Sequence, residues 1–169
     1  MTSLAGHLLI APPQERDLDF LRAVILVVQH SEEQAFGVVL NRPTNKTVKT
    51  VWKGKKKYPC NQPAYSGGPV SSPLMALHTD ASIADLEVLP GVYYSVRQKL
   101  LDQLLRRPVG PFKIFISHAG WGPSQLERWI AAGDWRTLPA TPKHVFDTET
   151  DLWEEVSKIV EPNVGPGPC

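Results

Sequence analysis

The stretch SHAGWGPSQLE holds the densest group of residues that could bind a ligand. Gly120 and Gly122 flank Trp121, and glycines let the backbone turn tightly and present N–H groups where a helix begins. A helix start of this kind attracts anions, and His118 and Gln125 would add hydrogen-bonding side chains beside it. The same residues equally fit a plain corner between a strand and a helix, in which the tryptophan anchors the core. The sequence leaves both interpretations open.

A second glycine-bearing break stands in the run SGGP, at Gly67 and Gly68. Its backbone N–H groups could form a nest for an anion, or the run could be a tight turn or bulge that leads into a strand. It lacks the GxSxG order of a serine nucleophile and the Gly-Lys-Ser/Thr of a phosphate loop. The run therefore indicates either a small anion site or a purely structural turn.

A third break follows an apolar strand at Asn41 and Arg42. The guanidinium could clamp a phosphate or a carboxylate, or it could pair with an internal acid such as Asp17 or Asp19. Together the three breaks suggest our first functional hypothesis. In it the chain is a binding or regulatory module that holds a small anion or a partner protein at these loops, with no catalytic residue and no cofactor.

The five histidines are scattered along the chain, at His7, His30, His78, His118 and His144. No two have the spacing of a helical or strand metal site, so we expect no metal centre. A hydrolase-like enzyme is an alternative function, since His30, His78 or His118 could serve as acid or base with Glu127 if they lie within hydrogen-bond reach. His78 and His118 are also candidate ligand-binding residues. Ordinary hydrogen bonding is the competing explanation for each histidine.

A lysine-rich stretch runs from Lys46 to Lys57, with Trp52 inside it and Tyr58 beside it. Charge and stacking together could hold single-stranded nucleic acid, which is a third possible function. A solvated loop or a charged guard on a sheet edge is the alternative. The formal net charge of only +1 argues against nucleic acid or an acidic membrane as the main partner.

Apolar and β-branched runs predict strands over 7–11, 23–28, 36–40 and 113–117, extended segments over 74–78 and 143–146, and a hairpin or bent strand over 88–94. Helical spacing predicts helices over 95–107 and 123–132. Thr47 could cap a short helix through Trp52, and a capping pattern over 148–151 precedes a last helix that ends at Val160. Strands cluster early and helices late without regular alternation, which favours an α+β fold with a largely antiparallel, curved sheet.

The length of 169 residues and the ordinary share of 42% hydrophobic residues predict one globular domain. We place it over residues 1–161 and expect the Pro/Gly-rich segment 162–169 to be a flexible tail. Cys60 and Cys169 are expected to be reduced thiols. No targeting segment is visible, and the apolar run 23–28 is too short to span a bilayer. We therefore expect a soluble, cytoplasmic protein with no membrane partner.

The ordered set of motifs resembles the YqgE/AlgH family of small bacterial proteins over about residues 4–160. The matching segments are GHLLIAP (6–12), FGVVLNRP (36–43), GGPV (67–70), LH (77–78) and AGWGPSQLE (119–127), followed by Trp135, Val145-Phe146 and Trp153. One departure stands out, because the family typically has Gly-Tyr where this chain has Ser117-His118. The run from Lys53 to Lys57 also looks peculiar to this chain.

The resemblance implies a bifurcated, largely antiparallel sheet folded into a pseudo-barrel, with helices packed outside. It implies no established enzyme activity. Some family members carry the label of transcriptional regulator by association with alginate control. The sequence gives that label little support, since the helix expected over 123–132 carries Arg128 as its one cation and no helix-turn-helix with a basic recognition helix is recognisable.

Overall fold

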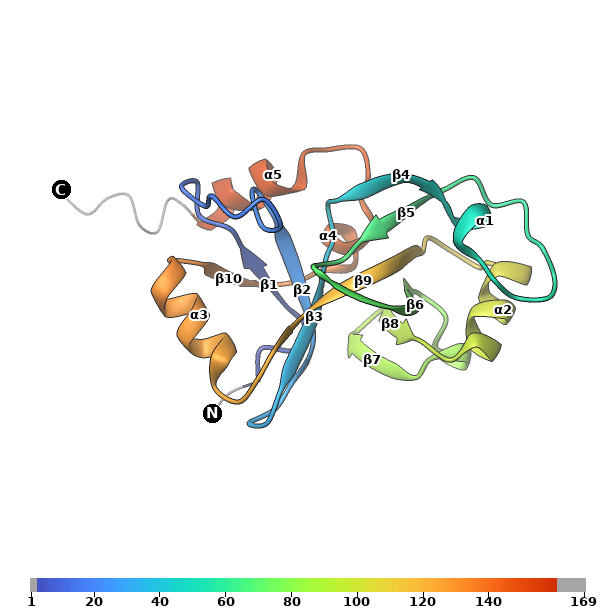
Figure 1. Ribbon diagram of the computed structural model, residues 1–169, viewed down its shortest axis with the longest axis horizontal. Helices are drawn as coiled ribbons and strands as arrows, with labels where there is room; N and C mark the ends of the chain where they lie inside the picture. Colours follow the sequence, from blue (N-terminus) through green and yellow to red (C-terminus); the bar gives the residue numbers. More distant parts are fainter. Residues whose placement is uncertain (1–2, 161–169) are drawn as a thin grey trace.

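A curled, mostly antiparallel sheet runs through the centre of the molecule, and the helices lie outside it (Figure 1). The computed structural model describes residues 3–160. Within them the strands are β1 (His7–Ile10), β2 (Val24–His30), β3 (Ala35–Val39), β4 (Pro43–Thr47), β5 (Pro63–Ser66), β6 (Val70–His78), β7 (Leu86–Leu89), β8 (Val92–Ser95), β9 (Lys113–Trp121) and β10 (Arg136–Pro139). The helices are α1 (Val48–Val51), α2 (Gln98–Arg106), α3 (Gln125–Gly133), α4 (Pro142–Phe146) and α5 (Leu152–Val160), with a 3-10 turn at Ala81–Ile83.

Strand β2 is apolar on both faces because each face enters a different core. Side chains alternate along a strand, so Leu26 and Val28 pack into one cluster with Phe115, while Ile25 and Val27 pack into another that contains Trp121. This double burial explains why the run VILVV contains no polar residue. The strand forms the expected antiparallel hairpin with β3.

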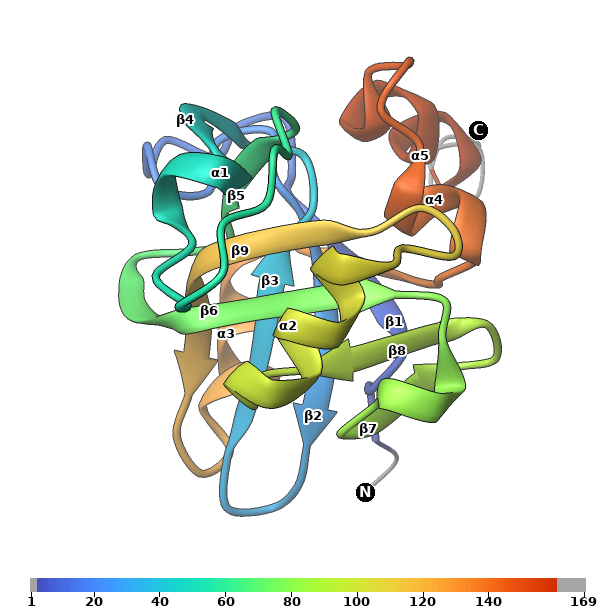
Figure 2. The same ribbon diagram turned by 90° about the vertical axis from the view of Figure 1, so that its right-hand side faces the viewer.

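Strand β9 belongs to both branches of the sheet. Its first half pairs with β6, with Phe115 opposite Met75, and its second half pairs with β3, where Ala119 is opposite Gly37. β5 also runs parallel to β9 on a third line of contacts. In Figure 2, β6 and the first part of β9 run across the direction of β2 and β3. The bifurcated, largely antiparallel pseudo-barrel of an α+β protein is thus confirmed.

Helix α2 covers one outer face of the sheet through a single apolar stripe. Leu100, Leu101, Leu104 and Leu105 are buried and pack in one cluster with Ile114 of β9. The spacing of these leucines predicted the helix, although Ser95 to Arg97 precede it and Ser95 belongs to β8. Arg106 lies in the last turn, where a cation favours the helix dipole.

Several predicted elements are correct, and three need correction. The expectation that 143–146 is extended is wrong, because Pro142–Phe146 forms α4, with Thr141 and His144 completing a capping box. β9 continues to Trp121 instead of ending at Ser117, so the corner before α3 comes later than expected. Asp151 rather than Thr148 supplies the side-chain cap before α5, since its carboxylate accepts the Glu154 N–H.

Within residues 3–160 no helix is long and apolar enough to cross a membrane. Cys60 is a half-buried free thiol. The expected tail at 162–169 and Cys169 lie outside the described residues.

Candidate functional site

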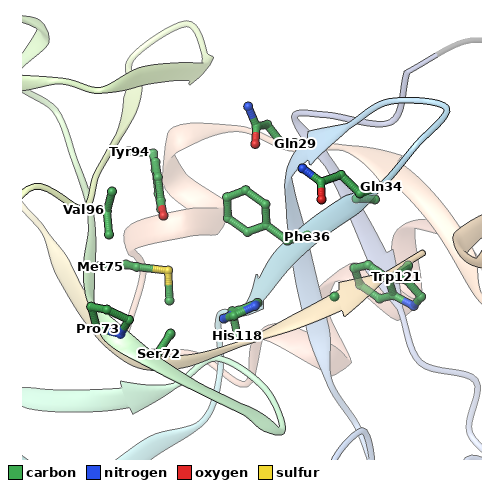
Figure 3. Close-up of a pocket in the computed structure, with 12 residues that line it drawn as sticks. Gln29, Gln34, Phe36, Ser72, Pro73, Met75, Tyr94, Val96, His118 and Trp121 are labelled. Carbon is green, nitrogen blue, oxygen red and sulfur yellow. The ribbon is translucent and has the colours of Figure 1, made fainter. Parts of the chain in front are cut away.

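A cavity of about 380 Å³ lies where the two branches of the sheet separate, on β9 beside His118. We call it the His118 cavity. Its size is within the range of about 300 to 1,000 Å³ that is usual for ligand pockets. Figure 3 shows the side chains that surround it. The lining residues are Gln29, Gln34, Ala35, Phe36, Ser72, Pro73, Met75, Tyr94, Val96, His118, Gly120 and Trp121.

Five strands from different parts of the chain line this cavity, namely β2, β3, β6, β8 and β9. β3 supplies Phe36, which pairs with Gly120 of β9. β6 supplies Met75, and β8 supplies Tyr94 on the facing wall. The Phe36 ring meets the Tyr94 ring and the His118 ring edge-on, with centroids 5.5 Å and 6.0 Å apart. The walls are therefore mostly aromatic and apolar.

Two polar atoms at the cavity are buried without a hydrogen-bond partner among the described residues. They are Nδ1 of His118 and Oγ of Ser72. The β6–β9 register shifts between Ser71 and Met75, so Ser72 lies in an irregular part of the ladder. In Figure 3, Ser72 and His118 lie on the same side of the cavity. Because buried polar groups are almost always paired, these two atoms indicate a missing partner such as a ligand or an ordered water.

None of the described residues that line the cavity has a permanently charged side chain. Burial lowers the pKa of His118 below its usual value, which favours the neutral ring. Burial also raises the pKa of Tyr94 to about 12, with a smaller contribution from Asp85. The Tyr94 hydroxyl points into the cavity toward Met75 (Figure 3). The site can therefore offer neutral hydrogen bonds and aromatic contacts, but no ion pair with a permanent cation.

The sequence profile of the AlgH-like family matches residues 8–164 of the chain. The chain belongs to the AlgH-like family. A UPF0301 protein from Myxococcus xanthus is 37% identical over 161 residues, which cover 91% of this chain and 89% of the relative. One from Streptomyces avermitilis is 34% identical and covers 92% of this chain and 86% of its own.

Two solved structures share the fold over almost the whole chain. The solution structure of the AlgH protein from Pseudomonas aeruginosa has a TM-score of 0.78 and 28% identity, with 99% of this chain and 96% of that chain covered. A crystal structure of a protein from Corynebacterium diphtheriae has a TM-score of 0.76 and 28% identity, with 98% and 88% covered. The resemblance inferred from the ordered motifs is confirmed.

Of the residues predicted to bind a ligand in this AlgH-like chain, His118, Gly120 and Trp121 line the cavity together. Gly67 and Gly68 lie directly behind them, where the backbone passes very close to β9. A Cβ atom on Gly67 would stand 2.3 Å from the Ser117 carbonyl oxygen. The Gly68 N–H donates to Ser117 Oγ. The two glycines thus permit close backbone packing.

Asn41 and Arg42 lie at the other end of β3. Ala35 pairs with Trp121 at the cavity end of β3. Because a strand rises about 3.3 Å per residue, Asn41 lies roughly 20 Å along the chain direction from Ala35. Asn41 accepts the Val24 N–H and donates to the Arg22 carbonyl. These two residues therefore belong to a separate hollow beside α5.

The Arg42 guanidinium bonds to the main chain of a neighbouring loop. It donates to the carbonyl oxygens of Leu18, Asp19 and Leu21. The prediction that it pairs with the carboxylate of Asp17 or Asp19 is wrong in this detail, because the loop turns its carbonyls, not its acids, toward the strand end.

The other two histidines of the hydrolase hypothesis have both ring nitrogens occupied. His78 is buried; its Nδ1 accepts the Asp80 N–H, and its Nε2 lies 2.8 Å from Ser95 Oγ. Burial lowers its pKa, consistent with a neutral ring. His30 Nδ1 accepts the Leu4 N–H, and its Nε2 lies 2.8 Å from the Glu127 carboxylate.

The Gly122 N–H before α3 is already paired. The Gln125 side chain accepts it at 2.7 Å, and Ser124 precedes the helix with a left-handed φ of 57° and no side-chain cap. This contact occupies the N–H of the second glycine of the GWG motif. Trp121 packs 5.5 Å from Trp129 in the core.

The aromatic residues of the lysine stretch are also occupied. Trp52 is only 4% exposed, and its ring N–H donates to the Lys56 carbonyl. The Tyr58 hydroxyl donates to Asp102. The buried Trp52 ring therefore has no free face for a base to stack on. Within residues 3–160, no group of three or more His, Cys, Asp or Glu side chains is placed to hold a metal ion.

Sequence reasoning missed Phe36, Ser72, Met75 and Tyr94. Phe36 stood inside a predicted strand and Tyr94 inside a predicted hairpin, so their inward direction depended on the register. Nothing in the sequence around Ser72 signals a buried hydroxyl. These residues meet only because β6 and β8 fold over the end of β3.

Proposed function

We propose that this AlgH-like chain is a non-catalytic binding protein that holds a planar, largely apolar group in the His118 cavity. The observation that supports the proposal is the pair of unpartnered buried atoms, Nδ1 of His118 and Oγ of Ser72, beside an aromatic wall. A bound group with a donor and an acceptor would supply both partners once the two side chains rotate toward it, and the rings of Phe36 and Tyr94 would contact its faces or edges.

The charge of the cavity narrows the class of ligand. Neither lysine nor arginine lines it, and the ring of His118 is favoured in its neutral form. Burying a full charge there without a partner would be costly. The site therefore suits a neutral or weakly acidic group, such as a phenol, an indole or an amide-bearing ring, better than a phosphate.

Binding is better supported than hydrolysis because the candidate acids and bases are occupied. His30 and His78 use both ring nitrogens in contacts with the protein itself. A general base needs a free lone pair within reach of the substrate. His118 has a free nitrogen, but no carboxylate orients it among the described residues.

The test is a titration of the isotope-labelled protein with indole and with phenol, followed by amide chemical shifts. We expect saturable shifts at Phe36, His118 and Gly120, with affinity in the millimolar range that is usual for fragments of this size. The variants Ser72→Ala and Tyr94→Phe should each weaken binding by about three- to tenfold, because each removes one hydrogen-bonding group.

The chain offers matched controls on the same strands. Ser71→Ala and Tyr93→Phe alter neighbouring residues that do not line the cavity, and they should leave the affinity unchanged. Shifts that cluster elsewhere, or equal losses for the cavity variants and their neighbours, would refute the proposal.

A further inference from the structure

We propose that the natural occupant of the His118 cavity is a side chain of an extended acidic peptide segment, whose acidic residues lie along the lysines that follow Trp52. This inference rests on the proposed function, since it assigns a partner to the same cavity. It goes further because it names the chemistry of the whole ligand. Three observations carry it: the hollows adjoin one another, their charge changes along the path, and β6 lacks a neighbouring strand there.

The His118 cavity adjoins a second hollow, and the two share one wall. Ser72, Pro73 and Val96 line both, and the second hollow has a volume of about 350 Å³. It is otherwise lined by Val51, Trp52, Lys53, Leu74, Gln98 and Leu101. Gln98 then also lines a third hollow with Lys55, Lys56 and Lys99. A linear molecule that crosses the Pro73 wall can therefore occupy all three.

The charge changes from neutral to basic along this path. The first cavity has no lysine, the second has Lys53, and the third has Lys55, Lys56 and Lys99. Asp102 also lines the third hollow, but its carboxylate is already bound by Tyr58 and Arg106. The path is thus complementary to a ligand with an apolar group at one end and negative charges at the other.

Strand β6 is open on the side where this ligand would lie. β8 ends at Ser95, which pairs with Ala76, so residues 72–74 have no strand beside them on that side within the described chain. Pro73 has no N–H to offer, which limits main-chain pairing there. An extended peptide would therefore take most of its affinity from side chains in the hollows on either side of Pro73.

A peptide fits this path better than a single strand of nucleic acid. Binding without base pairing depends on aromatic platforms for the bases. Trp52 and Tyr58, which are interleaved with the lysines, are held by hydrogen bonds to Lys56 and Asp102. The lysines alone would give only weak, unselective binding to phosphates.

The experiment measures fluorescence anisotropy of labelled ten-residue peptides with the full chain. One peptide carries a phenylalanine followed by four glutamates, and a second carries them in reverse order. The control peptides replace phenylalanine by serine, or the glutamates by lysines. We expect saturable binding of at least one acidic peptide, and a loss of about tenfold or more with each control peptide.

Charge-reversal variants of the protein locate the acidic end. Lys53→Glu, Lys55→Glu and Lys99→Glu combined should weaken binding of the acidic peptide by about tenfold. The negative charges of the variant would then repel the glutamates of the peptide. The matched control combines Lys46→Glu, Lys49→Glu and Lys57→Glu, which change the net charge equally but line none of the three hollows. That control should weaken binding clearly less than the first triple variant, because its lysines make no wall of the hollows.

Three results would overturn the inference. These are equal losses for the two triple variants, no saturable binding of either acidic peptide, and tighter binding of a single-stranded oligonucleotide than of the peptides. The fragment titration separates this inference from the proposed function. If indole shifts the amide signals of Phe36 and Gly120 while the peptides do not bind, the proposed binding function of the cavity stands and the assignment of a peptide ligand fails.

Discussion

His30 Nε2 lies 2.8 Å from Glu127 Oε2, and this contact joins the end of β2 to the first turn of α3. The His30 side chain is only 2% exposed. Its Nδ1 accepts the Leu4 N–H, which assigns the hydrogen of the neutral ring to Nε2 and makes it the donor to the carboxylate. Two residues 97 positions apart are therefore tied by one charge-assisted bond.

We predict that Glu127→Gln lowers the free energy of unfolding at pH 7 by about 0.5 to 1 kcal/mol. The pKa of Glu127 is lowered by its own backbone N–H and then by His30. A carboxyl group whose pKa is lowered on folding stabilises the fold at pH values above its ordinary pKa of 4.5. That stabilisation is lost as the pH falls through the pKa of the folded state. Denaturant unfolding between pH 7 and 3.5 should show the difference shrink below about pH 4.5. A constant difference would contradict the prediction, and Glu149→Gln is the control.

Lys113 should make stability depend on alkaline pH. Its amino group is buried, donates to the Leu40 carbonyl at 2.9 Å and lies over the Tyr65 ring. Burial lowers its pKa to about 8, partly opposed by Asp147. Between about pH 8 and 10 the unfolded chain holds a proton that the folded chain has lost, so stability rises with pH.

The predicted rise is on the order of 1 to 3 kcal/mol from pH 7.5 to 9.5. Lys113→Met should remove it, whereas the exposed Lys158→Met should not. The window stops below pH 10 because raised pKa values of Tyr65 and Tyr94 act in the opposite direction above it. A rise of the same size in Lys113→Met would refute the assignment to this residue.

Gly67→Ala should destabilise the fold by about 2 to 4 kcal/mol. The new Cβ would stand 2.3 Å from the Ser117 carbonyl oxygen, and only movement of the β5–β9 backbone could relieve that contact. Gly120→Ala is the matched control, because its Cβ would meet nothing closer than 3.9 Å. Thermal unfolding of the two variants should differ by several degrees or more. Similar melting temperatures would show that the chain tolerates separation of the strands there.

His118→Leu should make the free protein more stable while it loses indole binding. The substitution removes a buried nitrogen that has no partner among the described residues. It puts an apolar side chain in the same space. Removal of an unsatisfied buried polar group commonly gains about 1 kcal/mol or more. Unfolding and titration on the same sample check both parts. A destabilised variant would indicate that the nitrogen already has a water partner.

The sequence predicted the parts of the fold that depend on local pattern. The β2 run is apolar because both faces are buried, and the leucines of α2 recur at helical spacing, so both elements were correct. The prediction of an extended segment over 143–146 is wrong because Thr141 caps a short helix there and Pro142 stands at its first position. Short elements are decided by their caps as much as by apolar content.

The cavity could be predicted only in part. His118, Gly120 and Trp121 were candidates because glycines beside a tryptophan form a visible motif. Ser72 and Tyr94 could not be found, since their inclusion depends on a register shift in β6 and on the point where β8 ends. Asn41 and Arg42 looked similar in sequence, yet they bond to neighbouring main-chain groups far along β3.

The position of β9 has a consequence for how the chain is made. During synthesis β3 and β6 emerge long before β9, the strand that lies between them in the finished sheet. Until Trp121 has left the ribosome, both strands present unpaired edges of the kind that promotes aggregation. The two branches can join only through contacts as distant as Ala35 with Trp121. Closure of the sheet is therefore expected to be slow, and late in biosynthesis.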